Sequence, residues 1–226
     1  MCLVGNKRAD IARVIPCKNN FCTKFAHRFH FCGLQKLNTL NLRLFHPPLN
    51  PCNHFPTVLI KTNWYTISYK FYMCGCLTSI SIPPSVTTIE DGTFLGCHSL
   101  RNINIPDTVT RIGRSAFEDC ASLTSINIPP SLTTIEDGTF LCCHSLSNIS
   151  IPDTVTSIED YAFSECNSLK NINIPNGVTR IGDRTFFNCN SLKNINIPNG
   201  VTRIGDSAFY GCNSLISITI PSSVIA

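Results

Sequence analysis

The sequence predicts a β-rich solenoid, a chain wound into stacked coils of short strands and turns with few helices. The first observation is a fixed period, because proline, leucine and cysteine each recur at a constant 23-residue spacing. The second is that neighbouring units are almost identical: "LKNINIPNGVTRIGDRTFFNCNS" (169–191) is followed directly by "LKNINIPNGVTRIGDSAFYGCNS" (192–214). A constant period of 20–50 residues is typical of solenoids. The recurrent positions are Leu77, Leu100, Leu123, Leu146, Leu169, Leu192 and Leu215; Pro83, Pro106, Pro129, Pro152, Pro175, Pro198 and Pro221; and Cys74, Cys97, Cys120, Cys143, Cys166, Cys189 and Cys212.

Each unit reads L-x-x-I-x-I-P-x-x-V-x-x-I-x-x-x-x-F-x-x-C-x-x. Alternation of Ile80 and Ile82 with serine predicts a short strand with one buried side. Pro83 has no amide hydrogen and ends that strand. The following "SVTTI" predicts a second short extended segment, and "EDGTF" predicts a turn that returns Phe94 and Cys97 to the interior.

One coil of this kind cannot bury its own Ile, Phe and Leu side chains, whereas stacked coils bury them against their neighbours. With strands about 4.8 Å apart, about eight coils would extend about 40 Å. Whole coils are duplicated, since residues 77–122 and 123–168 match as two blocks. Duplication lengthens an array and does not create a unique catalytic pocket.

The run "SLTSINIPPSLTTIEDGTF", followed by C-x-S-L at 23-residue spacing, resembles the BspA-like leucine-rich-repeat family. The resemblance covers about residues 74–226 and implies a right-handed leucine-rich-repeat coil. Relatives of this type serve as interaction surfaces, including surface proteins of bacteria and protists. The resemblance therefore implies binding rather than catalysis.

Charge and pattern divide the chain into two regions. Residues 1–54 form a basic extension with Cys and His that does not fit the repeat and is expected to be poorly ordered. Residues 55–226 form the solenoid, with a degenerate first coil at 55–76, regular coils from residue 77 and an incomplete last coil. Residues 1–70 contain ten basic side chains and one acid, for a net charge of +9.

The exposed side of the first strand in each coil is the candidate binding surface. Its outward positions predict a continuous sheet of amides and hydroxyls that could bind a protein partner or a glycan, or could simply be solvated. It contains no aromatic residue, which argues against stacking of sugars or of nucleic-acid bases. The proposed binding residues are Asn102, Asn104, Asn127, Asn148, Asn171, Asn173, Asn194 and Asn196.

The repeat cysteines are flanked by Phe and Leu, and we interpret them as small buried side chains. Cys97-His98 and Cys143-His144 would form a catalytic dyad only if sulfur and imidazole met. Because the cysteine is expected to point inward, its histidine should point to solvent. The sequence therefore predicts no enzyme and no cofactor. A recurrent aspartate, as at Asp91, is expected to cap the turn before Phe by accepting backbone N–H groups.

An alternative function is zinc-dependent nucleic-acid binding by the basic extension. Cys22-x4-His27-x4-Cys32 resembles the last three ligands of a retroviral-type zinc knuckle, with Cys17 as a substitute first ligand. Sulfur and imidazole are the ligands that zinc prefers. The knuckle's first position holds Asn19 and its glycines are absent, so nucleic acid is a disfavoured partner.

Several sequence features bear on where the protein is located and how it assembles. No apolar run reaches the roughly 18 residues of a membrane span, and the N-terminus lacks a secretory signal pattern. Many unpaired cysteines favour a reducing, cytoplasmic location. The family resemblance leaves a cell-surface adhesin as a further alternative. The last coil, ending in "ITIPSSVIA", has no polar cap and could mediate self-association.

Overall fold

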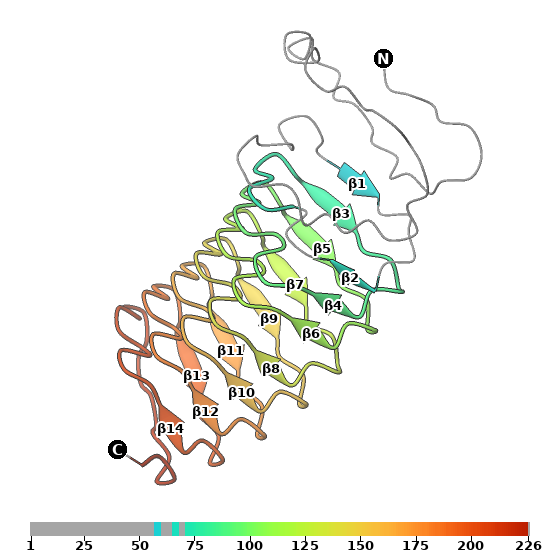
Figure 1. Cartoon of the computed structure of the whole chain (residues 1–226). Coiled ribbons are helices and arrows are strands. Elements are labelled where there is room, and N and C mark those ends of the chain that lie inside the picture. Colours follow the sequence, from blue (N-terminus) through green and yellow to red (C-terminus); the bar gives the residue numbers. More distant parts are fainter. Residues whose placement is uncertain (1–56, 60–64, 68–70, 226) are drawn as a thin grey trace, which may run out of the picture.

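The computed structural model describes residues 57–59, 65–67 and 71–225, which wind into a parallel β-solenoid. Each coil contributes one strand to each of two rows (Figure 1). The part of the chain that the structure describes contains strands and turns but no helix. The first row comprises β1 (Thr57–Leu59), β3 (Ser79–Ser81), β5 (Asn102–Asn104), β7 (Ser125–Asn127), β9 (Asn148–Ser150), β11 (Asn171–Asn173) and β13 (Asn194–Asn196).

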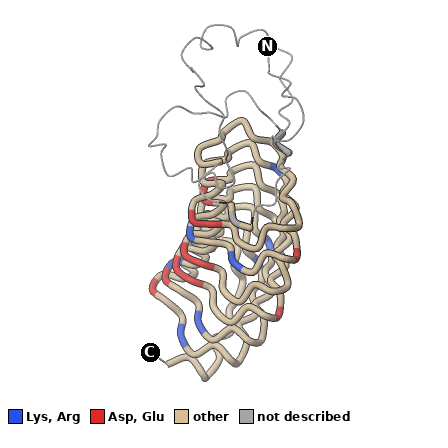
Figure 2. The backbone as a smooth tube through the Cα atoms, turned by 45° about the vertical axis from the view of Figure 1, so that its right-hand side comes forward, with Lys and Arg blue, Asp and Glu red and all other residues tan. Residues whose placement is uncertain are grey.

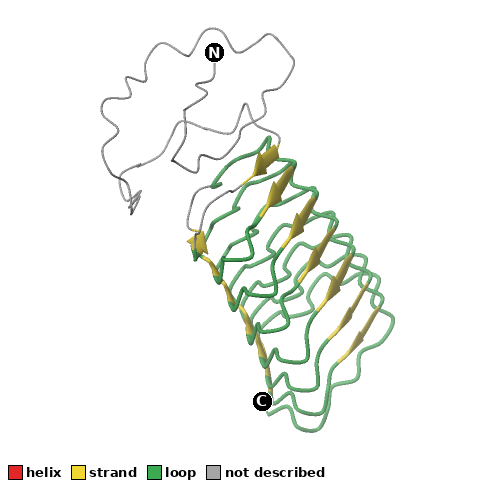
Figure 3. Cartoon of the chain, turned by 90° about the vertical axis from the view of Figure 1, so that its right-hand side faces the viewer, coloured by secondary structure: helices red, strands yellow, loops and turns green. Residues whose placement is uncertain are grey.

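The second row consists of two-residue strands, and Figure 3 shows it on a different side of the coil from the first row. Proline follows each strand of the first row from β3 to β13, and the chain then turns into the second row, as the sequence predicts. The second row comprises β2 (Thr66–Ile67), β4 (Thr88–Ile89), β6 (Arg111–Ile112), β8 (Thr134–Ile135), β10 (Ser157–Ile158), β12 (Arg180–Ile181) and β14 (Arg203–Ile204).

All strand pairs are parallel, and from β3 and β4 onward each pair is offset by one full repeat. Ile126 pairs with Ile149, and Ile172 pairs with Ile195, each exactly one repeat further along the chain. In the pair β1–β3 the offset is one residue short of a full repeat, because Val58 pairs with Ile80. Further along the same coil, Phe71 stacks on Phe94 at the full repeat interval. The first coil is therefore one residue shorter before Phe71 than the later coils.

Neither row is one continuous sheet. The first row divides into a five-stranded sheet ending at β9 and a two-stranded sheet, β11–β13. The second row divides between β6 and β8 into sheets of three and four strands. The two interruptions lie at different coil junctions, so wherever one row is interrupted the other is still hydrogen-bonded. Residues 217–219, where the repeat predicts another strand, form none in this structure.

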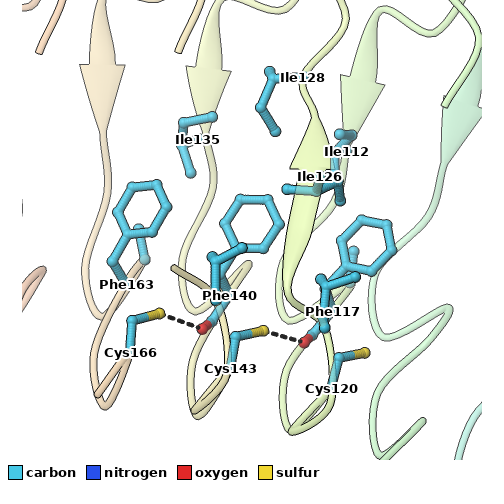
Figure 4. Packing of buried hydrophobic residues seen from close by; sticks show 14 of the residues in the cluster. Ile112, Phe117, Cys120, Ile126, Ile128, Ile135, Phe140, Cys143, Phe163 and Cys166 are labelled. Carbon is cyan, nitrogen blue, oxygen red and sulfur yellow. Dashed lines mark hydrogen bonds between the residues drawn. The ribbon is translucent and has the colours of Figure 1, made fainter. Parts of the chain in front are cut away.

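The core lies inside the coils and consists of ladders of identical side chains (Figure 4). Phenylalanine rings stack from Phe71 to Phe209, with centroids 5.2–5.7 Å apart. These distances are within the favourable range for aromatic pairs. Ile158 and Ile181 of the second row are fully buried, and Ile172 of the first row is almost so. The core is thus shared by both rows.

The cysteine ladder lies beside the phenylalanines, and its thiols bond to the backbone. The Cys143 thiol donates to the Phe117 carbonyl oxygen at 3.2 Å, and the Cys166 thiol donates to Phe140 at 3.3 Å (Figure 4). The same contact recurs at Cys97, Cys120, Cys189 and Cys212. At these positions the expectation of buried, unpaired cysteines is met, although Cys212 is only partly buried. Cys74 is disulfide-bonded, so that expectation is wrong for the first coil.

Candidate binding surface

The candidate surface is the outward side of the first row, which we call the strand face. In β5, β7, β11 and β13 the outer two residues of each strand are exposed and the central isoleucine is buried. This alternation is the period-2 pattern of a strand with one buried side. The structure exposes all eight predicted residues: Asn102, Asn104, Asn127, Asn148, Asn171, Asn173, Asn194 and Asn196.

Side-chain hydrogen bonds on the strand face are long. The Asn194 amide donates to Asn171 Oδ1 at 3.4 Å, and the Thr124 hydroxyl donates to Asn102 Oδ1 at 3.5 Å. Both distances lie beyond the usual 2.7–3.2 Å range. An asparagine side chain has two donors and two acceptor sites, so a single long contact leaves most of this capacity for a ligand or water.

The second row is different, because its polar groups bond to one another. Threonine hydroxyls bond to carbonyl oxygens one full repeat back at 3.1–3.4 Å, and the shortest of these bonds joins Thr202 to Thr179. Arg180 contacts Glu159 at 3.0 Å and Asp160 at 3.2 Å. Arg111 forms the same kind of pair with Glu90 and Asp91, at 3.0 and 2.9 Å. Acidic and basic positions lie along the same edge of the solenoid in Figure 2.

The recurrent aspartates hydrogen-bond to the coil that follows. Asp160 Oδ1 accepts the Asp183 N–H at 2.8 Å, and Asp183 Oδ1 accepts the Asp206 N–H at 3.0 Å. Asp91 bonds in the same way to the Arg114 N–H. Capping of an amide by aspartate is therefore confirmed at three positions, but the donor is in the next coil and not in the aspartate's own turn.

These aspartate bonds occur where the next coil has glycine just before the donor. A Cβ added at Gly182 would lie 2.4 Å from Asp160 Oδ1 and 2.5 Å from the Asp160 nitrogen. Gly113 and Gly205 are equally crowded by Asp91 and Asp183. The coil that follows Asp137 has Glu159 at the position of this glycine. Asp137 instead forms an ion pair with Arg114 at 3.4 Å. The sequence signal for this bond is an aspartate with a glycine one residue short of a full repeat later, as in Asp160 and Gly182. This signal was not recognised from the sequence.

The Cys-His pairs do not form catalytic dyads. The Cys97 thiol donates to the Phe71 carbonyl, and burial raises its pKa from 9.0 to about 12. His98 is exposed, and its Nδ1 lies 3.1 Å from the Asp119 carbonyl oxygen. A buried neutral thiol is a poor nucleophile, because the thiolate is the reactive form. The described residues also contain no group of three or more His, Cys, Asp or Glu placed to hold a metal ion.

Several predictions concern residues outside those described. The zinc candidates Cys17, Cys22, His27 and Cys32 all lie there, as does the whole basic extension. The division of the chain at residue 55 therefore stays a prediction. Within the described residues no helix is long and apolar enough to cross a membrane.

One surface group was missed by the sequence reasoning because it departs from the repeat consensus. On the turn side of the last coils, Arg184 lies over the ring of Tyr161 at 5.6 Å, and Phe187 stacks on Tyr210 at 5.2 Å. Earlier coils have glycine or serine where Tyr161 stands. Aligning the coils and marking the residues that differ would have found this group.

The last coil exposes apolar side chains. Ile216 is 84% exposed, and Ile225 and Ile220 are also exposed. Leu215, Ile218 and Val224 are partly buried against the core. Self-association through this coil stays a prediction.

Comparison with known proteins places these features in context. The family model of the BspA-type leucine-rich repeat region matches residues 65–186 and 133–226, in six copies. A solved leucine-rich repeat protein from T. pallidum is 29% identical over 71% of this chain and 84% of its own, with a TM-score of 0.61. One from Eubacterium ventriosum is 24% identical over 66% of this chain and 43% of its own, with a TM-score of 0.54. No curated protein matches.

Proposed function

The chain belongs to the BspA-type leucine-rich repeat family, and on that basis we propose that it is a non-catalytic scaffold that binds a protein partner along its strand face. Membership of the family indicates a protein-binding or adhesin-like role in general. Choosing the strand face, and a protein as the ligand, goes beyond the comparisons and rests on the surface itself.

The observation that supports this choice is the contrast in hydrogen bonding between the rows. Beside the second row, many polar groups bond to one another, as Asp160 does to Asp183 and Arg180 to Glu159, although the buried Nε of Arg180 has no hydrogen-bond partner. The strand face keeps exposed amides whose side-chain contacts are long, as between Asn171 and Asn194. Amide donors and acceptors alternate along it and complement a peptide backbone, which also carries both.

The experiment is site-directed photo-cross-linking with extracts of the organism that makes the chain. A photoreactive phenylalanine analogue replaces Asn173 or Asn196 on the strand face, and in the matched control it replaces Thr179, an exposed residue directly before β12. We expect the strand-face positions to give the same cross-linked protein and the control to give none of it. Equal cross-linking from all three positions, or from the control alone, would contradict the proposal.

Self-association is proposed as a separate property of the last coil. The last coil leaves the apolar side chains of Ile216, Ile220 and Ile225 exposed, and exposed apolar surface promotes association. Light scattering over a concentration series should show association that Ile216→Lys abolishes. A chain that stays monomeric at high concentration would contradict this idea without affecting the strand-face proposal.

A further inference from the structure

The charge on the strand side of the coils changes along the solenoid. Residues 100–110 contain one arginine, Arg101, and one acid, Asp107, whereas residues 146–156 contain only an acid, Asp153. Residues 169–179 and 192–202 share the sequence LKNINIPNGVT, with one lysine each and no acid. Asparagine replaces the aspartate in both. The strand face is therefore neutral or negative in the earlier coils and carries a charge of +2 in these two.

The two lysines are neighbours across one strand pair. Asn171 pairs in register with Asn194, and the Lys193 N–H donates to the Lys170 carbonyl oxygen at 3.0 Å. Their Cα atoms are thus separated by about one strand spacing, ~4.8 Å. They flank the two-stranded sheet β11–β13, which is separate from the five-stranded sheet before it. Both side chains are exposed.

These lysines have no counter-charge among the described residues, unlike Arg111 and Arg180 of the second row. Arg111 and Arg180 each contact two carboxylates at 2.9–3.2 Å, whereas neither Lys170 nor Lys193 forms an ion pair. Like charges on neighbouring strands repel and reduce stability. A duplicated pair of unneutralised cations therefore does not help the fold, but it would attract a ligand with negative charge.

The surroundings of the lysines indicate what kind of anion fits. Four exposed asparagines lie between and beside them: Asn171, Asn173, Asn194 and Asn196. Amides of this kind bond to peptide groups and to carboxylates. The patch has no aromatic side chain for base stacking, and two cations are few for a phosphate or sulfate polymer. We infer that the surface around Lys170 and Lys193 binds an acidic segment of a protein partner.

This inference rests on the proposed function and adds to it the chemistry of the partner. The partner's carboxylates meet the two lysines while its backbone lies along the asparagines of β11 and β13. Charges at the edge of an interface mainly raise the association rate and select the partner. Binding should therefore weaken steeply as salt rises, because exposed charges are screened.

The test uses the full chain and a fluorescein-labelled peptide of ten glutamates, followed by fluorescence anisotropy at low salt. Lys170→Gln/Lys193→Gln should weaken binding about tenfold or more, a loss of about 1.4 kcal/mol. Arg101→Gln is the matched control, because it removes a cation from the same repeat position in a neutral coil. It should change the affinity less than about twofold.

Two further measurements keep the inference falsifiable. Removing the repulsion should leave the thermal midpoint of the double variant unchanged or slightly higher, which separates lost binding from lost folding. A ten-residue oligothymidylate and a heparin fragment are measured beside the peptide, and either binding more tightly would overturn the assignment to an acidic peptide. No peptide binding, or an equal loss in Arg101→Gln, would overturn it as well. Cross-linking from Asn173 in the same protein would then show that the proposed function survives.

Discussion

The two strand rows of this solenoid cover the same core, but the polar side chains on their outer sides differ in their hydrogen bonding. In the second row, Arg180 contacts Glu159 and Asp160, and threonine hydroxyls bond along the coils. In the first row, exposed asparagines contact each other only at long distance, as Asn194 does Asn171. A repeat protein can thus stabilise one side internally and leave the other available. Under the proposed function, the second row contributes stability and the first row binds the partner.

The largest effect on stability is expected from ionising the cysteine thiols, which are buried in the core that the two rows share. Burial raises the pKa of Cys97 from 9.0 to about 12 and that of Cys212 to about 11. Because the folded pKa lies above the unfolded one, the stabilisation is complete below pH 9 and is lost as pH rises from 9 toward these values. A fully buried thiol of this kind should cost about 1.4 kcal/mol per pH unit between pH 9 and its folded pKa, and the partly buried Cys212 should cost less.

Urea melts under reducing conditions at pH 8 and pH 10 measure this effect. Burial also raises the pKa values of Cys120, Cys143, Cys166 and Cys189, so each of these thiols should make the fall in stability with pH steeper. Cys143→Ala is the control, since one fewer thiol should make the fall with pH less steep. A stability that stays level up to pH 10 would show that the thiols are not buried in solution.

The next test removes one ring of the shared core. Phe163 is fully buried between Phe140 and Phe186. Phe163→Ala should lower the free energy of unfolding by about 3–5 kcal/mol, because it leaves a cavity. Deleting residues 146–168, a whole coil, should leave a cooperative melt, because neighbouring coils present equivalent faces. The array interpretation fails if the deletion unfolds the chain and Phe163→Ala does not.

A smaller test compares two glycines. Gly182→Ala should cost about 1–3 kcal/mol, because its Cβ would meet Asp160 at 2.4 Å and backbone cannot move aside easily. Gly177→Ala is the control, since its Cβ would meet Val155 only at 3.5 Å and the change should stay within about 0.5 kcal/mol. Equal costs in chemical denaturation would mean that the Asp160 bond to the next coil does not constrain the backbone.

Much of this architecture was predictable from the sequence because a constant period repeats every contact. The inward positions of Ile126 and Phe163, the exposure of Asn171 and the burial of Cys143 all follow from pattern and burial. These inward and outward positions could not have been predicted from the sequence of a single coil. The repetition supplies the information that one short strand lacks.

Features that depend on the contact between particular coils were not predictable in this way. The Asp160 bond requires glycine in the next coil, and strand pairing is interrupted between β9 and β11 and between β6 and β8 although the units there are otherwise equivalent. The disulfide of Cys74 departs from the ladder to which its position belongs. The strand-face binding residues remain a prediction, because exposure alone does not identify a ligand.

The most direct test compares two variants for stability and for affinity toward the cross-linked partner. One replaces Asn171, Asn173, Asn194 and Asn196 with serine, which other coils already carry at these positions. The other replaces Asp160 and Arg180 with alanine. We predict that the serine variant loses affinity at least tenfold with a stability change below about 1 kcal/mol. The alanine variant should lose about 1–2 kcal/mol of stability and keep its affinity. Unchanged affinity in the serine variant, or an equal loss in both folded variants, would contradict the division between the two rows.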